Sequence, residues 1–191
     1  MDFHDVVVGR RSIRKYKDKE ISVVDLNEIL EAGIAAPNGM NLQPWYFVMV
    51  KDKEKLNQGK ALMGKVYDRF KPVLEERFSR NPSIVKETGD FLTTLGGAPA
   101  LLLAFASRPD YNDSVVVISG ISAALENMLL AAFNKGIGSC WITAPIVTKM
   151  GRDFEELFAP DKGQLIACAT FGYPDECPAM PPRRVGKYEI L

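Results

Sequence analysis

The sequence has little of the chemistry that metal sites and nucleophilic enzymes use. It contains one histidine, His4, and three cysteines, Cys140, Cys168 and Cys177, and neither a CxxC nor an HExxH motif occurs. A zinc site and a histidine-based catalytic triad are therefore not expected. The three unevenly spaced cysteines do not suit a disulfide framework, and they indicate reduced thiols in a cytoplasmic protein.

An excess of charge of one sign is also lacking. The 24 lysines and arginines balance 24 aspartates and glutamates, so the chain has no general positive field for nucleic acid. The first residues, MDFHDVV, have no basic segment followed by a long apolar run, which argues against a signal peptide. No uninterrupted apolar run reaches the roughly 18 residues that a membrane span needs. We therefore expect neither a nucleic-acid nor a membrane partner.

What the sequence does contain is typical of a globular domain. Its 191 residues are 47% hydrophobic and 25% charged, which suits one domain over residues 1–191. Apolar runs of strand length alternate with segments of helical character. Strands are expected at 45–50, 99–106, 139–143 and 164–174, and helices at 2–8, 22–36, 52–93, 119–135 and 147–158. This order predicts a three-layer domain in which helices sandwich a mixed sheet.

Local signals add detail to two of these helices. Ser22 is the expected N-cap of the second helix, with Asp25 three residues later. The apolar residues that repeat there at helical spacing predict its buried face: Leu26, Ile29, Leu30 and Ile34. In the charged stretch 52–93, Gly64, Pro72 and Pro82 predict breaks.

The helix at 119–135 is small and apolar on almost all sides. Between Ile121 and Phe133 it carries one charge, Glu126, and Gly136 is its expected C′ residue. A helix so poor in charge is normally buried on most of its surface. It is expected at the centre of the domain or at a subunit interface.

The stretch "VVVGRRSIRKY" concentrates basic residues near the amino terminus. Arg10, Arg11, Arg14 and Lys15 surround Ser12. In an extended segment Arg10, Ser12 and Arg14 point to one side, and two guanidinium groups beside a hydroxyl suit a phosphate or carboxylate. A solvated basic turn is the commoner meaning of such a run, whereas a nucleic-acid patch is disfavoured by the zero net charge. This stretch alone leaves the choice open.

A second polar segment, "AAPNGMNLQPWYFVMV", precedes a predicted buried strand. Asn38, Asn41 and Gln43 lie between two prolines, and their amides can donate and accept hydrogen bonds. Gly39 would allow a ligand to approach the backbone. An ordinary helix-to-strand loop is the alternative, and it explains the run of amides less well.

Taken together, four segments resemble the FMN-dependent nitroreductase family. They are "RRSIRKY", "AAPNGMNLQPWYFVMV", "GISAALENMLLAAFNKGIGSCWIT" and "FGYPDE…PPRR", in the same order as in the family. The resemblance covers nearly the whole chain except residues 52–95. It implies an α+β fold and a domain-exchanged homodimer, with two flavins at the subunit interface and tail segments that exchange between the subunits.

The resemblance also implies an FMN site with four parts. The first motif would hold the phosphate, the ribityl chain and the pyrimidine edge of the flavin; the second would reach over the flavin of the partner subunit; the third would lie beside the ring. Near the carboxyl terminus one of two arginines would be a second phosphate ligand, and Arg183 is preferred. The implied cofactor-binding residues are Arg10, Arg11, Ser12, Arg14, Pro37, Asn38, Gly39, Asn41, Gln43, Trp141, Ile142, Thr143, Ala144, Arg183 and Arg184. Serine is commoner in the family at the position of Asn38, which favours a backbone contact there. Neither a catalytic residue nor a metal is implied.

The implied reaction is a ping-pong hydride transfer. NADH or NADPH would reduce FMN transiently, and a nitroaromatic, quinone or related small oxidant would take the electrons. The absence of a GxGxxG fingerprint agrees with a nicotinamide that is held only briefly. Two alternatives stay open: a flavin enzyme for reductive dehalogenation or flavin fragmentation, and a slow-turnover flavin-binding protein.

The region 64–95 bears on the substrate of either enzyme. A zwitterionic substrate would need a charged lid there, for which charged residues are available: Lys65, Arg69, Lys71, Glu75, Glu76 and Arg77. The aromatic residues Tyr67, Phe70, Phe78 and Phe91 would either wall a substrate site or form the core of a helical hairpin.

Overall fold

Four strands form one sheet in the computed structural model, which describes residues 1–107 and 113–191. The spatial order is β1 (Trp45–Val50), β2 (Ala100–Ala106), β4 (Gln164–Gly172), β3 (Gly138–Ile142). Each neighbouring pair is antiparallel, so the sheet is not the mixed one that the sequence predicted. Two successive helices, α3 (Lys53–Arg77) and α4 (Pro82–Thr94), return the chain to the end of β1, and β2 therefore starts there and runs the opposite way.

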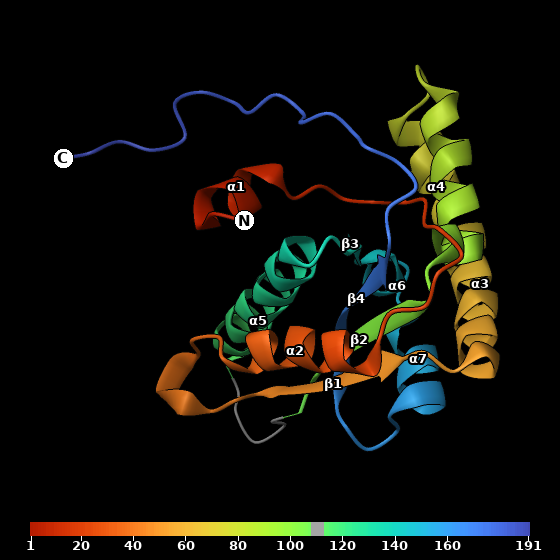
Figure 1. The fold of residues 1–191 in the computed structure, drawn as a ribbon. Coiled ribbons are helices and arrows are strands. Elements are labelled where there is room, and N and C mark those ends of the chain that lie inside the picture. Colours follow the sequence, from red (N-terminus) through yellow and green to blue (C-terminus); the bar gives the residue numbers. More distant parts are fainter. Residues whose placement is uncertain (108–112) are drawn as a thin grey trace.

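Helices cover both faces of this sheet (Figure 1). One face packs against α2 (Val23–Ile34) and α5 (Ser114–Asn134), around the buried residues Leu102, Leu125 and Phe171. The other packs against α3, α4, α6 (Ala144–Val147) and α7 (Gly151–Phe158), around Leu101, Leu103 and Phe154. The α+β class and the three layers are thus confirmed.

The first two helices begin and end close to where their sequence signals predicted. The short helix α1 (Phe3–Gly9) lies where a helix was predicted. Ser22 caps α2, with its Oγ accepting the N–H of Asp25 at 3.0 Å. Leu26 and Ile29 are buried, but Ile34, the last residue of α2, is 54% exposed, so its predicted burial is wrong for the single chain.

The predicted breaks in 52–93 are wrong at two of three positions. The 25-residue helix α3 continues through Gly64 and Pro72, and only Pro82 marks a boundary, as the first residue of α4. The local cost of a mid-helix proline is outweighed by burial on the same helix. The buried residues of α3 are Leu56, Gly59, Met63, Val66 and Leu74.

The apolar helix α5 begins five residues before its predicted start. Asp113 caps it by accepting the N–H groups of Val115 and Val116 at 3.0 and 3.3 Å, and Gly136 has the positive φ of +72° expected of a C′ residue. Among the described residues α5 alone is long and apolar enough to cross a membrane, a span that the sequence reading did not identify. It packs against α2 and the sheet, which is typical of a core helix, and 44% of that apolar window is buried.

The carboxyl-terminal third also departs from prediction in one helix. The single helix expected at 147–158 is divided into α6 and α7, and Lys149 between them has a left-handed φ of +58°. After β4 the chain has no regular helix or strand. As predicted it is extended: it passes over α1 and ends away from the body of the molecule (Figure 1).

Candidate functional site

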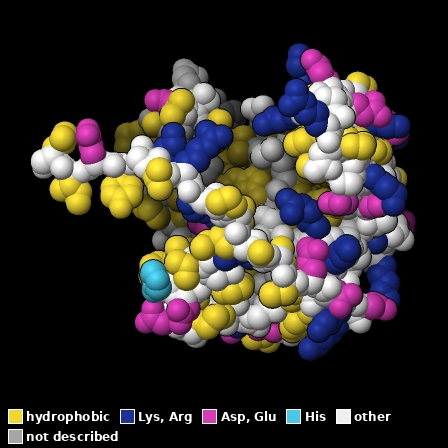
Figure 2. All heavy atoms as spheres, turned by 90° about the horizontal axis from the view of Figure 1, so that it is seen from above, with side chains coloured by type: hydrophobic (Ala, Val, Ile, Leu, Met, Phe, Trp, Pro, Cys, Tyr) yellow, Lys and Arg dark blue, Asp and Glu magenta, His cyan; other side chains and the backbone are white. Residues whose placement is uncertain are grey.

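Arginines from the two ends of the chain meet in one groove. This basic groove, of about 380 Å³, is lined by Arg10, Arg11, Ser12, Arg14, Pro178, Ala179, Pro181 and Arg183. The first four residues follow α1, and the last four belong to the extended tail. Figure 2 shows the molecule from above, and on this face Lys and Arg side chains flank a hollow with an apolar floor. Of the two candidate tail arginines, Arg183 lines the groove and Arg184 is not among its lining residues.

The segment 10–14 is held against the outer edge of β3. The N–H of Ile13 donates to the carbonyl oxygen of Ser139 at 2.9 Å, in a short parallel bridge between Ser12 and Ser139. Ile13 is buried whereas Arg14 is exposed, as the predicted alternation of an extended segment requires. The sheet therefore supports the basic residues from below.

Arg10 lies between the groove and α5. Its Nε is 3.3 Å from Oε1 of Glu126, the one charged residue of α5. The Nε atom is buried, yet its N–H makes no hydrogen bond with the described residues. Arg10 also lines the basic groove, where a guanidinium group suits an anionic ligand that supplies acceptors.

Arg11 has a different environment. Its Nη1 donates to the carbonyl oxygens of Val8 and Arg10, each at 2.6 Å, at the end of α1. A cation that bonds the last carbonyls of a helix stabilises that end. Arg11 thus ties α1 to the basic segment, in addition to lining the groove.

Arg14 separates the basic groove from a second, larger one. Its guanidinium carbon is 6.0 Å from the centroid of the Phe91 ring on α4, and its backbone N–H donates to Oε1 of Glu176 at 2.5 Å. The second groove, of about 710 Å³, carries charges of both signs and is called the charged groove below. Its lining residues are Ser12, Arg14, Lys15, Lys86, Glu87, Asp90, Phe91, Thr94, Gly96, Glu176 and Pro178.

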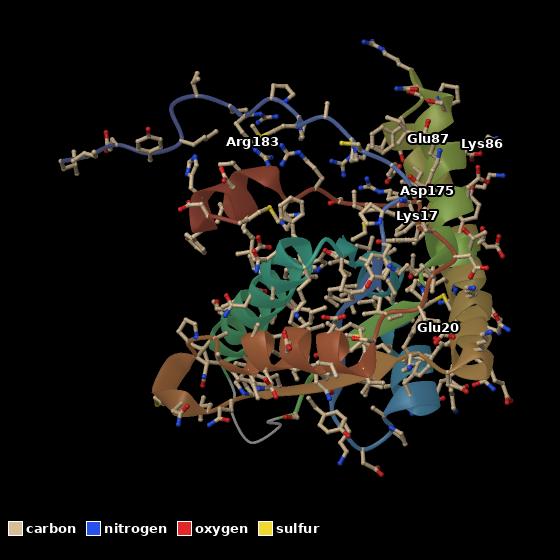
Figure 3. All side chains as sticks on the ribbon, viewed as in Figure 1. Lys17, Glu20, Lys86, Glu87, Asp175 and Arg183 are labelled. Carbon is tan, nitrogen blue, oxygen red and sulfur yellow. The ribbon has the colours of Figure 1, made fainter. Side chains whose placement is uncertain are left out.

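Sequence reasoning named Arg14 and Lys15 but missed four charged residues of the charged groove: Lys86, Glu87, Asp90 and Glu176. Lys86 and Glu87 project from α4 while Arg183 lies on the tail above α1 (Figure 3). The charges proposed for a lid came from α3 instead, where Lys71 pairs with Glu75 along the helix at 3.8 Å. The residues "DE" after "FGYP" were the available signal for Glu176, since they belong to a motif already singled out.

The third predicted motif continues β3 beyond this segment. Because Ser12 pairs with Ser139 in parallel, Trp141 lies level with Arg14. Trp141 is half-buried, Ile142 and Ala144 are buried, and Thr143 is exposed. The structure therefore brings the first motif, the third motif and Arg183 together.

The second motif lies elsewhere in the same chain. A Cβ added to Gly39 would lie 2.7 Å from Cγ1 of Val116, near the start of α5, whereas Arg10 pairs with Glu126. Ten helical residues separate these contacts by about 15 Å along the axis of α5. A single chain thus does not unite the loop at Pro37–Gln43 with the basic groove.

The amides of this loop are partly used within it. Asn38 Oδ1 accepts the N–H of Gln43 at 2.8 Å, and Gln43 Nε2 donates to Asn41 Oδ1 at 3.3 Å. Met40, Asn41 and Gln43 have left-handed φ values of +53°, +51° and +46°, a conformation that costs a non-glycine residue about 1 kcal/mol or more. The side chain of Asn38 therefore holds the loop together, and its backbone carbonyl oxygen accepts the N–H of Asn41 at 3.4 Å.

The aromatic residues of 64–95 contribute mainly to the core. Phe91 is buried, and Tyr67 and Phe70 pack against the same core cluster. Phe78 is half-buried and lines a groove of about 420 Å³ between the facing ends of α3 and α4, together with Tyr67. Of these four aromatic residues, Phe91 also lines the charged groove.

The buried groups beneath the grooves are held neutral. Tyr16 donates to the carbonyl oxygen of Ile13 at 2.6 Å and pairs with Thr170, while its burial raises the pKa of the phenol well above the ordinary value. Burial also raises the pKa of Cys140, and that of Cys168 to about 12. The described residues include no cluster of His, Cys, Asp or Glu that could hold a metal ion. The two buried cysteines are therefore not thiolate nucleophiles, and the basic groove offers anion recognition.

The chain is similar to known proteins over almost its whole length. The chain is 37% identical over 190 residues to an NADH dehydrogenase of Thermus thermophilus, covering 92% of this chain and 88% of the relative. It is 31% identical over 185 residues to an iodotyrosine deiodinase of Thermotoga neapolitana, covering 91% and 89%. A nitroreductase of Bacteroides fragilis, solved with bound FMN, has the same fold with a TM-score of 0.76, 26% identity, and coverage of 100% of this chain and 99% of that one.

A family model described as "Nitroreductase family" matches residues 7–173, which include the basic segment, the loop, α5 and all four strands. The chain therefore belongs to the nitroreductase family.

Proposed function

We propose that the protein is an FMN-dependent NAD(P)H oxidoreductase that reduces small nitroaromatic, quinone or related oxidants. The observation that carries the proposal is the convergence of Arg10, Ser12, Arg14 and Arg183 on one groove. Bound FMN would accept hydride from NADH or NADPH and pass the electrons to the oxidant. The FMN-bound family structure and the NADH dehydrogenase relative support the two cofactors.

In this proposal the chain supplies binding and orientation. Arg10, Ser12 and Arg183 bind the phosphate, because guanidinium donors match its oxygens in charge and geometry. Arg14 faces the pyrimidine edge of the flavin, where a cation stabilises the reduced form. Trp141, level with Arg14, and the following residues Ile142, Thr143 and Ala144 lie beside the ring. The residues 1–191 act as one FMN-binding domain, and the three free thiols suit a cytoplasmic location.

The proposal includes a domain-exchanged homodimer. The loop containing Pro37, Asn38, Gly39, Asn41 and Gln43 would reach the basic groove of the partner subunit, since it does not reach its own. Two further features favour a partner. In the described chain the outer edge of β1 is unpaired, and the tail exposes large apolar side chains, with Tyr188 at 88% and Ile190 at 93% exposure.

The test is a titration of apo-protein with FMN, followed by reduction under nitrogen. We expect saturable binding and loss of the flavin absorbance near roughly 450 nm when NADH or NADPH is added, followed by its return with a nitroaromatic or quinone. A chain that fails to bind FMN would overturn the proposal. Binding with reduction over hours instead of seconds would favour the slow-turnover flavin-binding protein.

A second candidate is reductive dehalogenation of a zwitterionic aromatic substrate. It is favoured by the charged groove, where Lys86 and Lys15 stand with Glu87 and Asp90 beside the ring of Phe91, and by the iodotyrosine deiodinase relative. Comparing halide release from a halotyrosine with reduction of a nitroaromatic separates the two candidates. Halide release that falls in Lys86→Ala, with nitroreduction unchanged, would support the second.

A further inference from the structure

The basic segment is clasped from the carboxyl-terminal side by residues 173–176. The N–H of Lys17 donates to the carbonyl oxygen of Tyr173, and the N–H of Asp175 donates to that of Lys15, both at 2.9 Å. Tyr16 and Pro174 form an antiparallel bridge between these hydrogen bonds. The segment 14–17 is thus an extended ribbon with the tail paired along it.

The backbone N–H of Arg14 differs from its neighbours because its hydrogen-bond acceptor is a side chain. The N–H groups of Ile13, Tyr16 and Lys17 donate to backbone carbonyl oxygens of the sheet edge, of Gly96 and of the tail. The N–H of Arg14 donates to Oε1 of Glu176 at 2.5 Å, across 162 residues of sequence. If the Oε1 atom of the half-buried Glu176 were removed, the backbone N–H of Arg14 would lose this hydrogen-bond acceptor.

Glu176 carries a negative charge at a place where an anion is expected to bind. It lies among Arg14, Lys15 and Lys86 and next to a groove that collects arginines, where a carboxylate weakens the attraction for any anion. A negative charge at an anion site needs a compensating role. The geometry offers one, because the backbone of Arg14 sets the direction of its own side chain and, by alternation, of Ser12 and Arg10.

We propose that Glu176 is a positioning residue that orients the anion-binding side chains through the backbone N–H of Arg14. The inference rests on the proposed FMN site, whose phosphate and pyrimidine contacts it would align. Glu176 itself binds neither part of the cofactor. The negative charge of Glu176 weakens the attraction for an anion. This cost is offset because the anion meets hydrogen-bond donors that are already held in position.

Two neutral variants separate the two effects. Glu176→Gln keeps a side-chain oxygen that can accept the N–H of Arg14, whereas Glu176→Met has similar length and no such acceptor. Both remove the negative charge, so a difference between them reports the hydrogen bond alone. We expect FMN to bind the Gln variant at least as tightly as the wild type, and the Met variant about tenfold more weakly than the Gln variant. Equal affinities for the two variants would overturn the proposal.

A readout without cofactor makes the result independent of the proposed function. Amide hydrogen exchange of Arg14, followed by NMR of the ¹⁵N-labelled apo-protein, should be faster in Glu176→Met than in Glu176→Gln. Exchange at Leu103, in the central strand β2, serves as the control and should be equal in both. A wild type that binds no FMN would overturn the proposed function, and equal exchange at Arg14 in the two variants would overturn the positioning role of Glu176.

Discussion

At the scale of single residues, the arginines of the basic segment have unequal roles. Arg10 pairs with Glu126 at one edge of the basic groove, Arg11 bonds the carbonyls that end α1, and Arg14 contacts the ring of Phe91. The described contact of the Arg10 side chain is one carboxylate, and that of the Arg14 side chain is one aromatic ring. Arg11, in contrast, is bonded to two backbone carbonyl oxygens. Arg10 and Arg14 are therefore the residues whose loss should be felt most by an anionic ligand.

Removal of either of these arginines tests the anion site. We expect Arg10→Ala and Arg14→Ala each to weaken FMN binding by about 1.5–3 kcal/mol, the range for charge-assisted hydrogen bonds. Arg14→Ala should also lower the flavin reduction potential, because the reduced flavin loses a nearby cation. Titration of apo-protein measures the first effect and a redox titration the second. Arg152→Ala, on an exposed face of α7, is the control and should change neither.

At the scale of elements, helix α3 contains two glycines with opposite surroundings. A Cβ on Gly64 would meet no atom within 4 Å, whereas one on Gly59 would lie 3.2 Å from Leu101 and 3.4 Å from Phe158. Gly64→Ala should therefore raise the free energy of unfolding by about 0.5–1 kcal/mol, because glycine disfavours a helix interior. Gly59→Ala should give a smaller gain or a loss. Urea denaturation compares them, and equal gains would contradict the packing at Gly59.

Helices α2 and α5 are joined by a small ion cluster. Nζ of Lys135 lies 3.0 Å from Oδ1 of Asp25 and also pairs with Glu28. The hydrogen bond from Ser22, and then that from Lys135, lowers the pKa of Asp25 below its ordinary value of 3.8. A lowered folded-state pKa gives stability that is present above pH 3.8 and lost as the pH falls through the folded-state value.

The pKa of Lys135 moves in the complementary direction. Its hydrogen bonds to Glu28 and Asp25 raise it above 10.5, so its contribution is complete below pH 10.5 and is lost as the pH rises through the folded-state pKa. We expect Lys135→Met to be less stable than the wild type near neutral pH, and the difference to shrink as the pH falls below 3.8. Urea midpoints at several pH values measure this. A difference that is constant with pH would show that the cluster contributes only packing.

The elements also show which sequence signals are reliable. The cap at Ser22, the C′ residue Gly136 and the four strands were predicted because each depends on local backbone chemistry or on a continuous apolar run. The breaks at Gly64 and Pro72 were predicted from intrinsic propensity, which burial of Met63 and Val66 outweighs. The mixed sheet was predicted from the alternation of strands and helices, which does not fix the direction of each strand; the pairing shows that all neighbours are antiparallel.

The candidate site could be predicted where its residues are close in sequence or belong to a recognised motif. Alternation along one extended segment put Arg10, Ser12 and Arg14 on one side, and the resemblance to the nitroreductase family assigned them to FMN. Glu126 and Glu176 could not be predicted in this way, because each meets the segment only after the fold has brought α5 and the tail to it. The positions of Lys86 and Asp90 in the charged groove could not be predicted either. A charged residue on an exposed helix looks the same in the sequence whether or not a groove lies beside it.

At the scale of the whole molecule, the basic groove and the Pro37–Gln43 loop are far apart in one chain. If they form one site between two subunits, the activity of mixed dimers can be predicted. Arg10→Ala and Asn41→Ala, each inactive alone, should restore activity when their subunits exchange. Equal amounts give about half mixed dimers with one intact site of two, so recovery should approach roughly a quarter of the wild-type activity. Steady-state assays after full exchange measure it. Recovery no greater than that of either parent would place both motifs in one chain, or remove one of them from the site.

The meeting of Arg10 with Arg183 has a consequence for how the protein is made. The ribosome synthesises Arg10 long before Arg183. The hydrogen bond from Arg14 to Glu176 likewise waits for residue 176, so the sheet and its helices can form before the groove exists. A nascent chain should therefore gain its fold before it gains affinity for a cofactor, and a premature stop shortly after β4 would leave a folded domain without a completed groove.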